Sequence, residues 1–357
     1  MQDTKIGCNT NLNYVIIDKD VKIQDGRSLM GYDSYPVYIS KKICSLMEGK
    51  NQMSNFIIAH LKANPFCGSG GLADVAGSLP HTLCRKGQDC RIVVPLYGTI
   101  PQELRNSLKF HYKLYRTCCM ASSVIADFSG QDGTTVHIIS LTMNTISSVV
   151  HFTVTMTMPR DLHSSQEQFF EMTPYIDFHP DMIHCNDWQT ALVPVYYYLF
   201  YSHRPWYHNI KSLFTIHNIQ YQGEYGWEVN TECVGIPANE TKILEMNGKL
   251  NMMKGAIETA TRVSTVSPSY AAEIKDPWFS WGLHDELNLR HYKLCGIKNG
   301  IDTESYNPET DYQIYRNYSK DDMSGKGECK RALQERLCLE QRWDVTNGWY
   351  GNKTCRS

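Results

Sequence analysis

The sequence predicts an α/β fold whose centre is a doubly wound parallel sheet of Rossmann-like type. Residues 56–59 form a short apolar run typical of a buried strand, a glycine-rich turn follows, and residues 72–85 carry apolar side chains at helical spacing. Apolar runs and helical patterns alternate again from residue 169 onward. Because strands that alternate with helices pair in parallel through right-handed crossovers, the residues that follow each strand should gather at one edge of the sheet.

The glycine-rich turn is the first candidate ligand site. Gly68, Gly70 and Gly71 stand between the first strand and its helix. Glycine lets backbone N–H groups come close to a ligand, and the first helical turn favours a phosphate through its unpaired amides and its dipole. Glycines after a strand also make an ordinary turn, so this cluster alone leaves both interpretations open.

The remaining elements follow in chain order. We expect strands at residues 90–96, 182–184, 213–216, 262–266 and 293–298, and helices at residues 169–176 and 251–260. Gly87 is a stop signal for the first helix, and Ser267 followed by Pro268 is a helix start in which serine is the cap. Asp187 is expected to cap the helix that follows it, with Trp188 packed beneath that helix.

The composition excludes several classes of protein. The 357 residues carry a formal net charge of −2, which gives no field to attract nucleic acid or an anionic membrane. The first residues lack the basic and apolar regions of a signal peptide, and no run of about twenty apolar residues occurs. The 13 cysteines include no CxxC pair and no zinc spacing, which indicates reduced thiols. We therefore expect a cytoplasmic protein with no nucleic-acid or membrane partner, no metal and no cofactor.

The first 44 residues follow a different pattern. Apolar residues recur there at close to six-residue spacing among glycine, asparagine and aspartate, at Ile6, Leu12, Ile17 and Ile23. This spacing resembles a left-handed parallel β-helix, in which one or two coils bury little core on their own. We expect residues 45–52 to link this segment to the α/β domain. An irregular N-terminal extension is the alternative.

Five motifs in the chain resemble, in the same order, those of the glycogen and starch synthases. They read GSGGLADVAGSLP, DMIHCNDWQTALVP, SLFTIHNIQYQGEYG, VSTVSPSYAAEI and GIKNGIDTESYNPETD. Members of this family are glucosyltransferases that use ADP-glucose and have the two-domain GT-B fold. The resemblance implies that residues 53–340 are the N-terminal catalytic domain. Residues 1–44 instead resemble the C-terminal end of ADP-glucose pyrophosphorylase, which suggests a fusion or two joined reading frames.

The family resemblance also implies a set of site residues. His217 and Asn218 match the pair beside the donor glucose, where His217 would hydrogen-bond the sugar and Asn218 would offer both a donor and an acceptor. The substrate-binding positions implied are Gly70, Gly71, Asp74, Asn186, Asp187, Gln189, Tyr221, Gln222 and Asn299. His184 is either a core residue or a sugar contact, and Asp302 is expected to fix a turn.

By resemblance, the reaction is the transfer of glucose from ADP-glucose to the non-reducing end of an α-1,4-glucan, glycogen or starch, with retained configuration. No pair of neighbouring carboxylates for a double displacement is readable in the sequence. The family therefore implies an internal-return or ion-pair route. The alternative function is a non-catalytic glucan-binding or assembly module that uses the same groove.

Three departures from the family pattern weaken the expectation of activity. Gly68 stands where the family has a phosphate-binding lysine, and the missing contact removes about 1.5–3 kcal/mol of interaction. Residues 113–168 do not match, which indicates either a translated wrong reading frame or a divergent insertion. Residues 341–357 diverge, and the positions of the family's second domain are not in the sequence. We therefore expect this chain to turn over poorly by itself.

Overall fold

The computed structural model describes residues 5–6, 8–13, 15–17, 22–23, 28–30, 37–39, 54–59, 71–95, 109–116, 119–129, 135–142, 169–174, 176, 178–303 and 306–344. The chain divides into two compact units, Met1–Met53 and Ser54–Ser357. The expected linker at residues 45–52 lies outside the described residues.

The first unit consists of short strands that pair in parallel. The pairs are β1 (Lys5–Ile6) with β4 (Lys22–Ile23), β2 (Asn11–Asn13) with β5 (Ser28–Met30), and β3 (Val15–Ile17) with β6 (Val37–Ile39). Each strand therefore pairs with the one that follows it after a full circuit of the chain, as the coils of a β-helix do. Ile23, one of the apolar residues at six-residue spacing, is buried. The arrangement agrees with the coil pattern that this spacing predicts.

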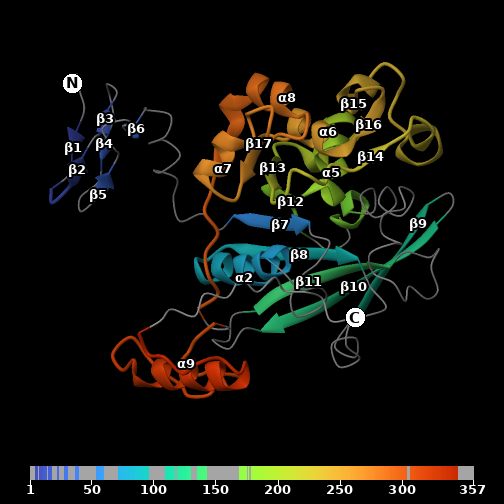
Figure 1. Ribbon diagram of the computed structural model, residues 1–357. Coiled ribbons are helices and arrows are strands. Elements are labelled where there is room, and N and C mark those ends of the chain that lie inside the picture. Colours follow the sequence, from blue (N-terminus) through green and yellow to red (C-terminus); the bar gives the residue numbers. More distant parts are fainter. Residues whose placement is uncertain are drawn as a thin grey trace. The chain divides into compact units, whose positions relative to one another are not determined.

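The second unit is built on a nine-stranded sheet. From one edge to the other its strands are β18 (Leu294–Gly296), β17 (Arg262–Thr265), β13 (Lys211–Ile216), β12 (Met182–Asn186), β7 (Asn55–Ala59), β8 (Asp89–Pro95), β11 (Thr135–Thr142), β10 (Cys119–Ser129) and β9 (Lys109–Arg116). Every pairing from β18 to β11 is parallel, whereas β10 pairs antiparallel with both of its neighbours. The predicted parallel α/β sheet is confirmed (Figure 1).

The order of the strands contains a reversal between β7 and β12. From β7 the chain proceeds to β8 and β11 on one side, and it later returns to place β12, β13, β17 and β18 on the other side. In open α/β sheets, ligands bind outside the carboxyl ends of the strands at such a topological switch point. The fold therefore indicates a ligand site at the loops that follow β7 and β12.

Strand β11 lies in the stretch that departs from the family pattern. It pairs in parallel with β8, and its side chains Val136 and Ile139 are fully buried. Residues 135–142 are therefore an integral part of the sheet. Residues 143–168, in the same stretch, lie outside the described residues, and the reading-frame hypothesis stays a prediction about the gene.

The helices lie between the strands as the sequence predicts. They are α2 (Gly71–Arg85), α5 (Leu192–Tyr196), α6 (Met252–Thr259), α7 (Pro268–Glu273), α8 (His284–Leu289) and α9 (Ser324–Arg336). Helix α2 packs against β8 and β11 and ends before Gly87, which has the positive φ of 79° expected of a stop signal. The predicted cap of α7 is also confirmed, since Ser267 Oγ accepts a hydrogen bond from the Tyr270 amide at 3.0 Å and Pro268 follows it.

Short elements fill the connections. The single-turn helices are η1 (Trp188–Thr190), η2 (Tyr197–Tyr201), η3 (Pro205–Tyr207), η4 (Asn230–Val234), η5 (Thr241–Ile243) and η6 (His291–Lys293). A three-stranded antiparallel sheet is formed by β14 (Glu224–Tyr225), β16 (Lys249–Asn251) and β15 (Glu245–Met246). Trp188 packs partly buried against the core, with its ring 6.2 Å from that of Tyr225.

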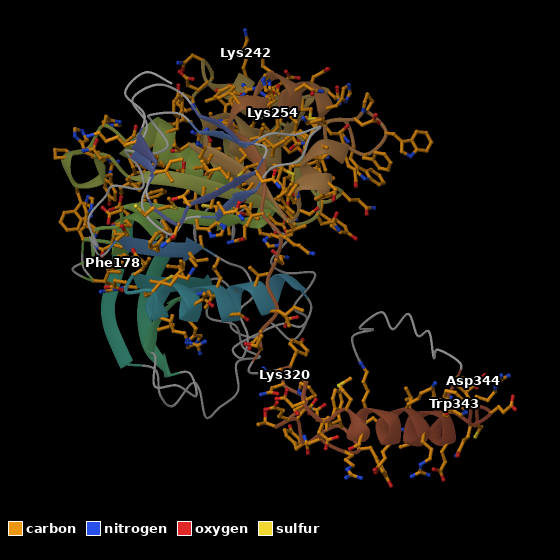
Figure 2. All side chains as sticks on the ribbon, turned by 90° about the vertical axis from the view of Figure 1, so that its left-hand side faces the viewer. Phe178, Lys242, Lys254, Lys320, Trp343 and Asp344 are labelled. Carbon is orange, nitrogen blue, oxygen red and sulfur yellow. The ribbon has the colours of Figure 1, made fainter. Side chains whose placement is uncertain are left out.

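A buried ionic cluster joins α6 to α8. Lys254 is 6% exposed, and its Nζ lies 3.0 Å from Glu258 Oε2 and also contacts the carbonyl of Lys242. Figure 2 shows Lys254 and Lys242 close together. Arg290, at the end of α8, reaches the same Glu258 carboxylate at 3.3 Å. Because a buried charge needs a partner, these contacts make the packing of the two helices specific.

Among the described residues, no helix is both long enough and apolar enough to cross a membrane.

Candidate functional site

The candidate site begins where β7 and β12 end. Asn186 is the last residue of β12, and its side chain is buried, with only 2% exposed. Its Nδ2 donates a hydrogen bond of 3.3 Å to the carbonyl of Ala59, the last residue of β7. One amide side chain therefore spans the switch point of the sheet.

His217 follows β13 and contacts the same amide. Its Nε2 lies 3.0 Å from Asn186 Oδ1. Since Nδ2 of Asn186 donates to the carbonyl of Ala59, Oδ1 is the acceptor, and His217 must donate through Nε2. Burial lowers the pKa of His217 to about 4. The ring is therefore neutral at pH 7, with Nδ1 as its hydrogen-bond acceptor.

Asp187 holds the turn that carries His217 and Asn218, the pair that the family resemblance implies as catalytic residues beside the donor glucose. Its Oδ1 accepts the backbone amide of His217 at 2.8 Å and that of Asn218 at 3.2 Å. Its own backbone has φ 56° and ψ 178°, a conformation that costs a residue with a side chain about 1–3 kcal/mol. Burial raises the pKa of Asp187 to about 6, and the two amide hydrogen bonds oppose that rise. The carboxylate is therefore ionised at pH 7, and it hydrogen-bonds to the backbone of the neighbouring loop.

The prediction that Asp187 caps the following helix is wrong. It occupies the cap position of η1, but its side chain makes no capping hydrogen bond there, because the carboxylate points across to the turn after β13. Thr190 supports this bend instead. Its Oγ1 accepts the amide of Asn186 at 2.7 Å and lies 2.9 Å from the Asn186 carbonyl. The sequence interpretation missed Thr190, although it stands in the same motif.

His184 is a core residue, so the structure decides between the two interpretations that the sequence left open. It is 9% exposed, and its Nε2 lies 2.7 Å from Thr215 Oγ1 on β13, which in turn lies 2.7 Å from Ser264 Oγ on β17. Burial, and secondarily the neighbouring His217, lowers the pKa of His184 to about 4. A neutral imidazole and two hydroxyls thus link three strands inside the sheet.

The turn after His217 and Asn218 carries two further predicted residues with different surroundings. Tyr221 is 60% exposed. Gln222 is buried, and its Nε2 donates to the carbonyls of Ile219 and Trp281, each at 3.0 Å. Its Oε1 accepts Asn251 Nδ2 at 2.6 Å. Gln222 therefore acts within the protein, where it fixes the turn, rather than at the surface.

The other predicted positions lie on neighbouring elements. Gly71 is the first residue of α2 and Asp74 lies in its first turn, half-buried, whereas Gly70 is outside the described residues. Gln189 is half-buried on η1, and Asn299 is exposed in the segment after β18. Asp302, in that same segment, accepts a hydrogen bond of 3.3 Å from Ser78 Oγ on α2.

The contacts thus join Asn186, Asp187, His217 and Asn218 directly, and they tie the segment after β18 to α2. Within the described ranges, no group of three or more His, Cys, Asp and Glu side chains could hold a metal ion. The chemistry available is hydrogen bonding by neutral imidazole and amide groups beside one ionised carboxylate.

Comparison with known proteins shows the family of this chain. Residues 57–289 match the family described as starch synthase catalytic domain. The chain belongs to this family. The matched range contains all the predicted site residues except Asn299 and also spans residues 113–168. The resemblance inferred from the five motifs is confirmed.

Curated members of the family are similar over most of this chain. The glycogen synthase of Alkaliphilus metalliredigens (strain QYMF) is 35% identical over 294 residues, which cover 79% of this chain and 60% of that protein. That of Clostridium perfringens (strain 13 / Type A) is 35% identical over 306 residues, or 84% of this chain and 62% of that protein. The chain therefore spans less than two thirds of the length of these relatives.

A solved structure of the family has the same fold. The catalytic domain of Starch Synthase IV from Arabidopsis thaliana, bound to ADP and acarbose, superposes with a TM-score of 0.66 at 29% sequence identity. The match covers 80% of this chain and 59% of that domain. The similarity confirms the predicted fold class for the sheet and its helices.

Proposed function

We propose that this chain binds ADP-glucose and positions its glucose for transfer, with retained configuration, to the non-reducing end of an α-1,4-glucan. The observation that carries the proposal is the group formed by Asn186, Asp187 and His217 at the switch point of the sheet, in a member of the starch synthase family. The ADP and acarbose held by the Arabidopsis relative support both a nucleotide and a sugar ligand.

Each residue has a role that follows from its contacts. His217, neutral and donating through Nε2, offers Nδ1 to a glucose hydroxyl, while the exposed Asn218 side chain offers a donor and an acceptor. The start of α2 offers backbone amides and a positive dipole end to the diphosphate. Fixed dipoles of this kind stabilise the charge that develops on the departing ADP and need little reorganisation.

Asp187 acts as a positioning residue in this proposal. Its Oδ1 already accepts hydrogen bonds from two backbone amides, so the carboxylate does not act as a nucleophile in this proposal. Holding His217 and Asn218 in one geometry favours the orientation of the glucose for attack by the acceptor hydroxyl. The anomeric configuration is then retained because ADP departs from, and the acceptor hydroxyl attacks, the same face of the sugar. This route does not use a pair of carboxylates.

The compartment proposed for the reaction is the cytoplasm. Cys90 and Cys185 are buried free thiols in strands of the sheet, and burial raises the pKa of both well above the usual range. Thiols of this kind persist where the surroundings are reducing.

The experiment that tests the proposal measures donor binding and transfer separately. ADP binding is followed by titration calorimetry, and transfer is followed as incorporation of labelled glucose from ADP-glucose into glycogen. We expect ADP to bind and His217→Ala to lower incorporation by about a hundredfold. Glycogen binding without any ADP binding would instead support the alternative, a glucan-binding module, and would end the proposal of a transferase.

For the first unit, we propose that residues 1–44 are the tail of an ADP-glucose pyrophosphorylase joined to a synthase domain. The parallel strand pairs β1–β4, β2–β5 and β3–β6 support this proposal. The gene sequence tests it, because a stop codon and a separate start near Met53 would exclude a fused protein.

A further inference from the structure

Asparagine followed by glycine occurs three times in the chain, at Asn247–Gly248, Asn299–Gly300 and Asn347–Gly348. Asparagine is a thermally labile residue, and a following glycine, which has no Cβ, leaves the asparagine side chain open to the next backbone nitrogen. The first two pairs belong to the described residues, and the third lies outside them. The fold places the two described pairs in different surroundings.

Asn247 and Gly248 form the two-residue turn between β15 and β16. Asn247 has φ 52° and Gly248 has φ 75°, as in a type I′ turn, and the flanking residues Met246 and Lys249 are paired with each other. The Gly248 amide donates to Glu245 Oε1 at 3.2 Å. The negative charge of this carboxylate opposes removal of the amide proton. The hairpin therefore protects Asn247, although both turn residues are exposed.

Asn299 and Gly300 lie in the irregular segment after β18, and both are exposed. Among the described residues, neither makes a hydrogen bond. The segment is anchored on both sides of them, because the Ile297 amide donates to a carbonyl of β17 at 2.8 Å and Asp302 accepts a hydrogen bond of 3.3 Å from α2. Apart from its chain neighbours, no described atom lies within 4 Å of a Cβ built at Gly300. The Asn299 side chain is therefore free to approach the Gly300 nitrogen.

We propose that Asn299 is a site of spontaneous deamidation, a modification that replaces its side-chain amide with a carboxylate. The Gly300 nitrogen loses its proton to hydroxide and attacks Cγ of Asn299. The new N–C bond forms as the bond from Cγ to Nδ2 breaks, and Nδ2 takes up a proton from water and leaves as ammonia. Water then opens the cyclic imide at either carbonyl, which gives aspartate or isoaspartate at position 299. Solvent water is the co-reactant, and neither step needs an oxidant or a reductant.

The modification alters the segment that connects β18 to α2. The proposed function assigns the donor diphosphate to the start of α2 and Asn299 to the donor site, and this consequence rests on that proposal. A carboxylate at position 299 repels the diphosphate. Isoaspartate also routes the backbone through Cβ, which lengthens the chain between β18 and the contact of Asp302 with Ser78. A stored chain therefore loses donor affinity while Asn186, Asp187 and His217 stay intact.

Peptide mass spectrometry of the full chain, stored in mildly alkaline buffer, tests the modification independently of any ligand. The peptide that contains Asn299 should convert about tenfold faster than the one that contains Asn247, because the hairpin must open before Asn247 can react. In urea, where the hairpin is lost, the two rates should become similar. Equal rates in the folded chain, or no conversion at Asn299, would overturn the proposal. A difference that persists in urea would refute the protection of Asn247 by the hairpin.

Gly300→Ala is the matched variant, because its Cβ shields the reacting nitrogen and the structure leaves open space for it. It should slow conversion of Asn299 about tenfold and leave the urea midpoint unchanged.

Calorimetry with ADP then compares fresh and stored chains. Fresh wild type and fresh Gly300→Ala should bind ADP alike, and storage should weaken binding about tenfold in the wild type alone. A converted wild type that binds ADP as the fresh chain does would refute the loss of donor affinity. Failure of the fresh wild type to bind ADP would instead overturn the proposed function, and the conversion of Asn299 would still be measured by mass spectrometry.

Discussion

The imidazole Nε2 of His217 lies 3.0 Å from the side-chain oxygen of Asn186, which joins the ends of β13 and β12. The same Asn186 amide reaches the end of β7 through the carbonyl of Ala59. Three neighbouring strands therefore meet at one side chain, and this side chain fixes which nitrogen of His217 carries the proton. The ring can then accept a hydroxyl hydrogen without having to change its tautomer.

Replacement of Asn186 tests this arrangement. Asn186→Ala removes the acceptor for Nε2, so His217 loses its fixed orientation, and glucose incorporation should fall about tenfold to a hundredfold. Asn186→Asp keeps an acceptor oxygen and should recover part of the rate. Asn239→Ala removes an exposed amide that contacts only Glu240 among its described partners, and it should have no effect. Equal incorporation by all three variants would contradict the role of Asn186.

Asp187 should contribute to the stability of the fold as well as to the positions of His217 and Asn218. Asp187→Ala leaves the amides of His217 and Asn218 without their acceptor, so the free energy of unfolding should fall by about 2–4 kcal/mol. Alanine keeps the Cβ that strains the backbone at φ 56°. Asp187→Gly loses the same hydrogen bonds but adopts the backbone freely, and it should be about 1 kcal/mol more stable than the alanine variant. Urea denaturation measures the free energy of unfolding of both variants. A glycine variant no more stable than alanine would show that the backbone is unstrained.

The stability of the fold should decrease in mild acid. The pKa values of His184 and His217 are lowered to about 4 in the folded chain, mainly by burial, whereas an unfolded histidine titrates near 6.5. The unfolded chain therefore binds more protons between these values, and the free energy of unfolding falls as pH drops through this window. Asp187, with its pKa raised to about 6, binds a proton more readily when folded and opposes part of this loss.

The two histidines contribute more to this pH dependence than the one carboxyl of Asp187 opposes. The free energy of unfolding should therefore be about 2 kcal/mol lower at pH 5 than at pH 7. The matched variant is His184→Gln, which keeps a polar group near Thr215 but does not titrate, and most of the pH dependence should disappear from it. Urea midpoints at both pH values provide the measurement. A wild-type chain equally stable at pH 5 and pH 7 would refute the assignment of neutral buried imidazoles.

Gly296, the last residue of β18, should resist substitution. A Cβ at this position would lie 2.2 Å from the carbonyl oxygen of Ser267, which caps α7. Gly296→Ala must therefore push the start of α7 away from the sheet, at a cost of about 1–3 kcal/mol in unfolding free energy. Gly300→Ala is the control from the same motif, since open space surrounds its Cβ. Equal urea midpoints for the two variants would contradict this packing.

The sequence predicted the sheet because its strands depend on local patterns. Apolar runs gave the parallel strands within a few residues of their observed ends, and the residues directly after β12 and β13 were expected at one edge. The partners of these residues were not readable. The bond from Asp187 to the His217 amide spans 30 residues and depends on a positive φ that aspartate rarely adopts.

Other features escaped prediction because they depend on distant partners. Gln222 was expected at the ligand, but its carbonyl partner at Trp281 lies 59 residues away, so only the fold shows that the amide is used internally. Strand β11 was not expected because its surroundings lack the family's pattern. Its place beside β8 is decided by the tertiary packing of Val136 and Ile139 rather than by local sequence.

The carboxylate of Asp187 and the amide protons of His217 and Asn218 form a reporter built into the chain. Amide protons held by a buried acceptor exchange with solvent only when their turn opens. Exchange rates and chemical shifts at these two positions would therefore register the arrival of a sugar at the neighbouring side chains, even under conditions in which no glucose is transferred.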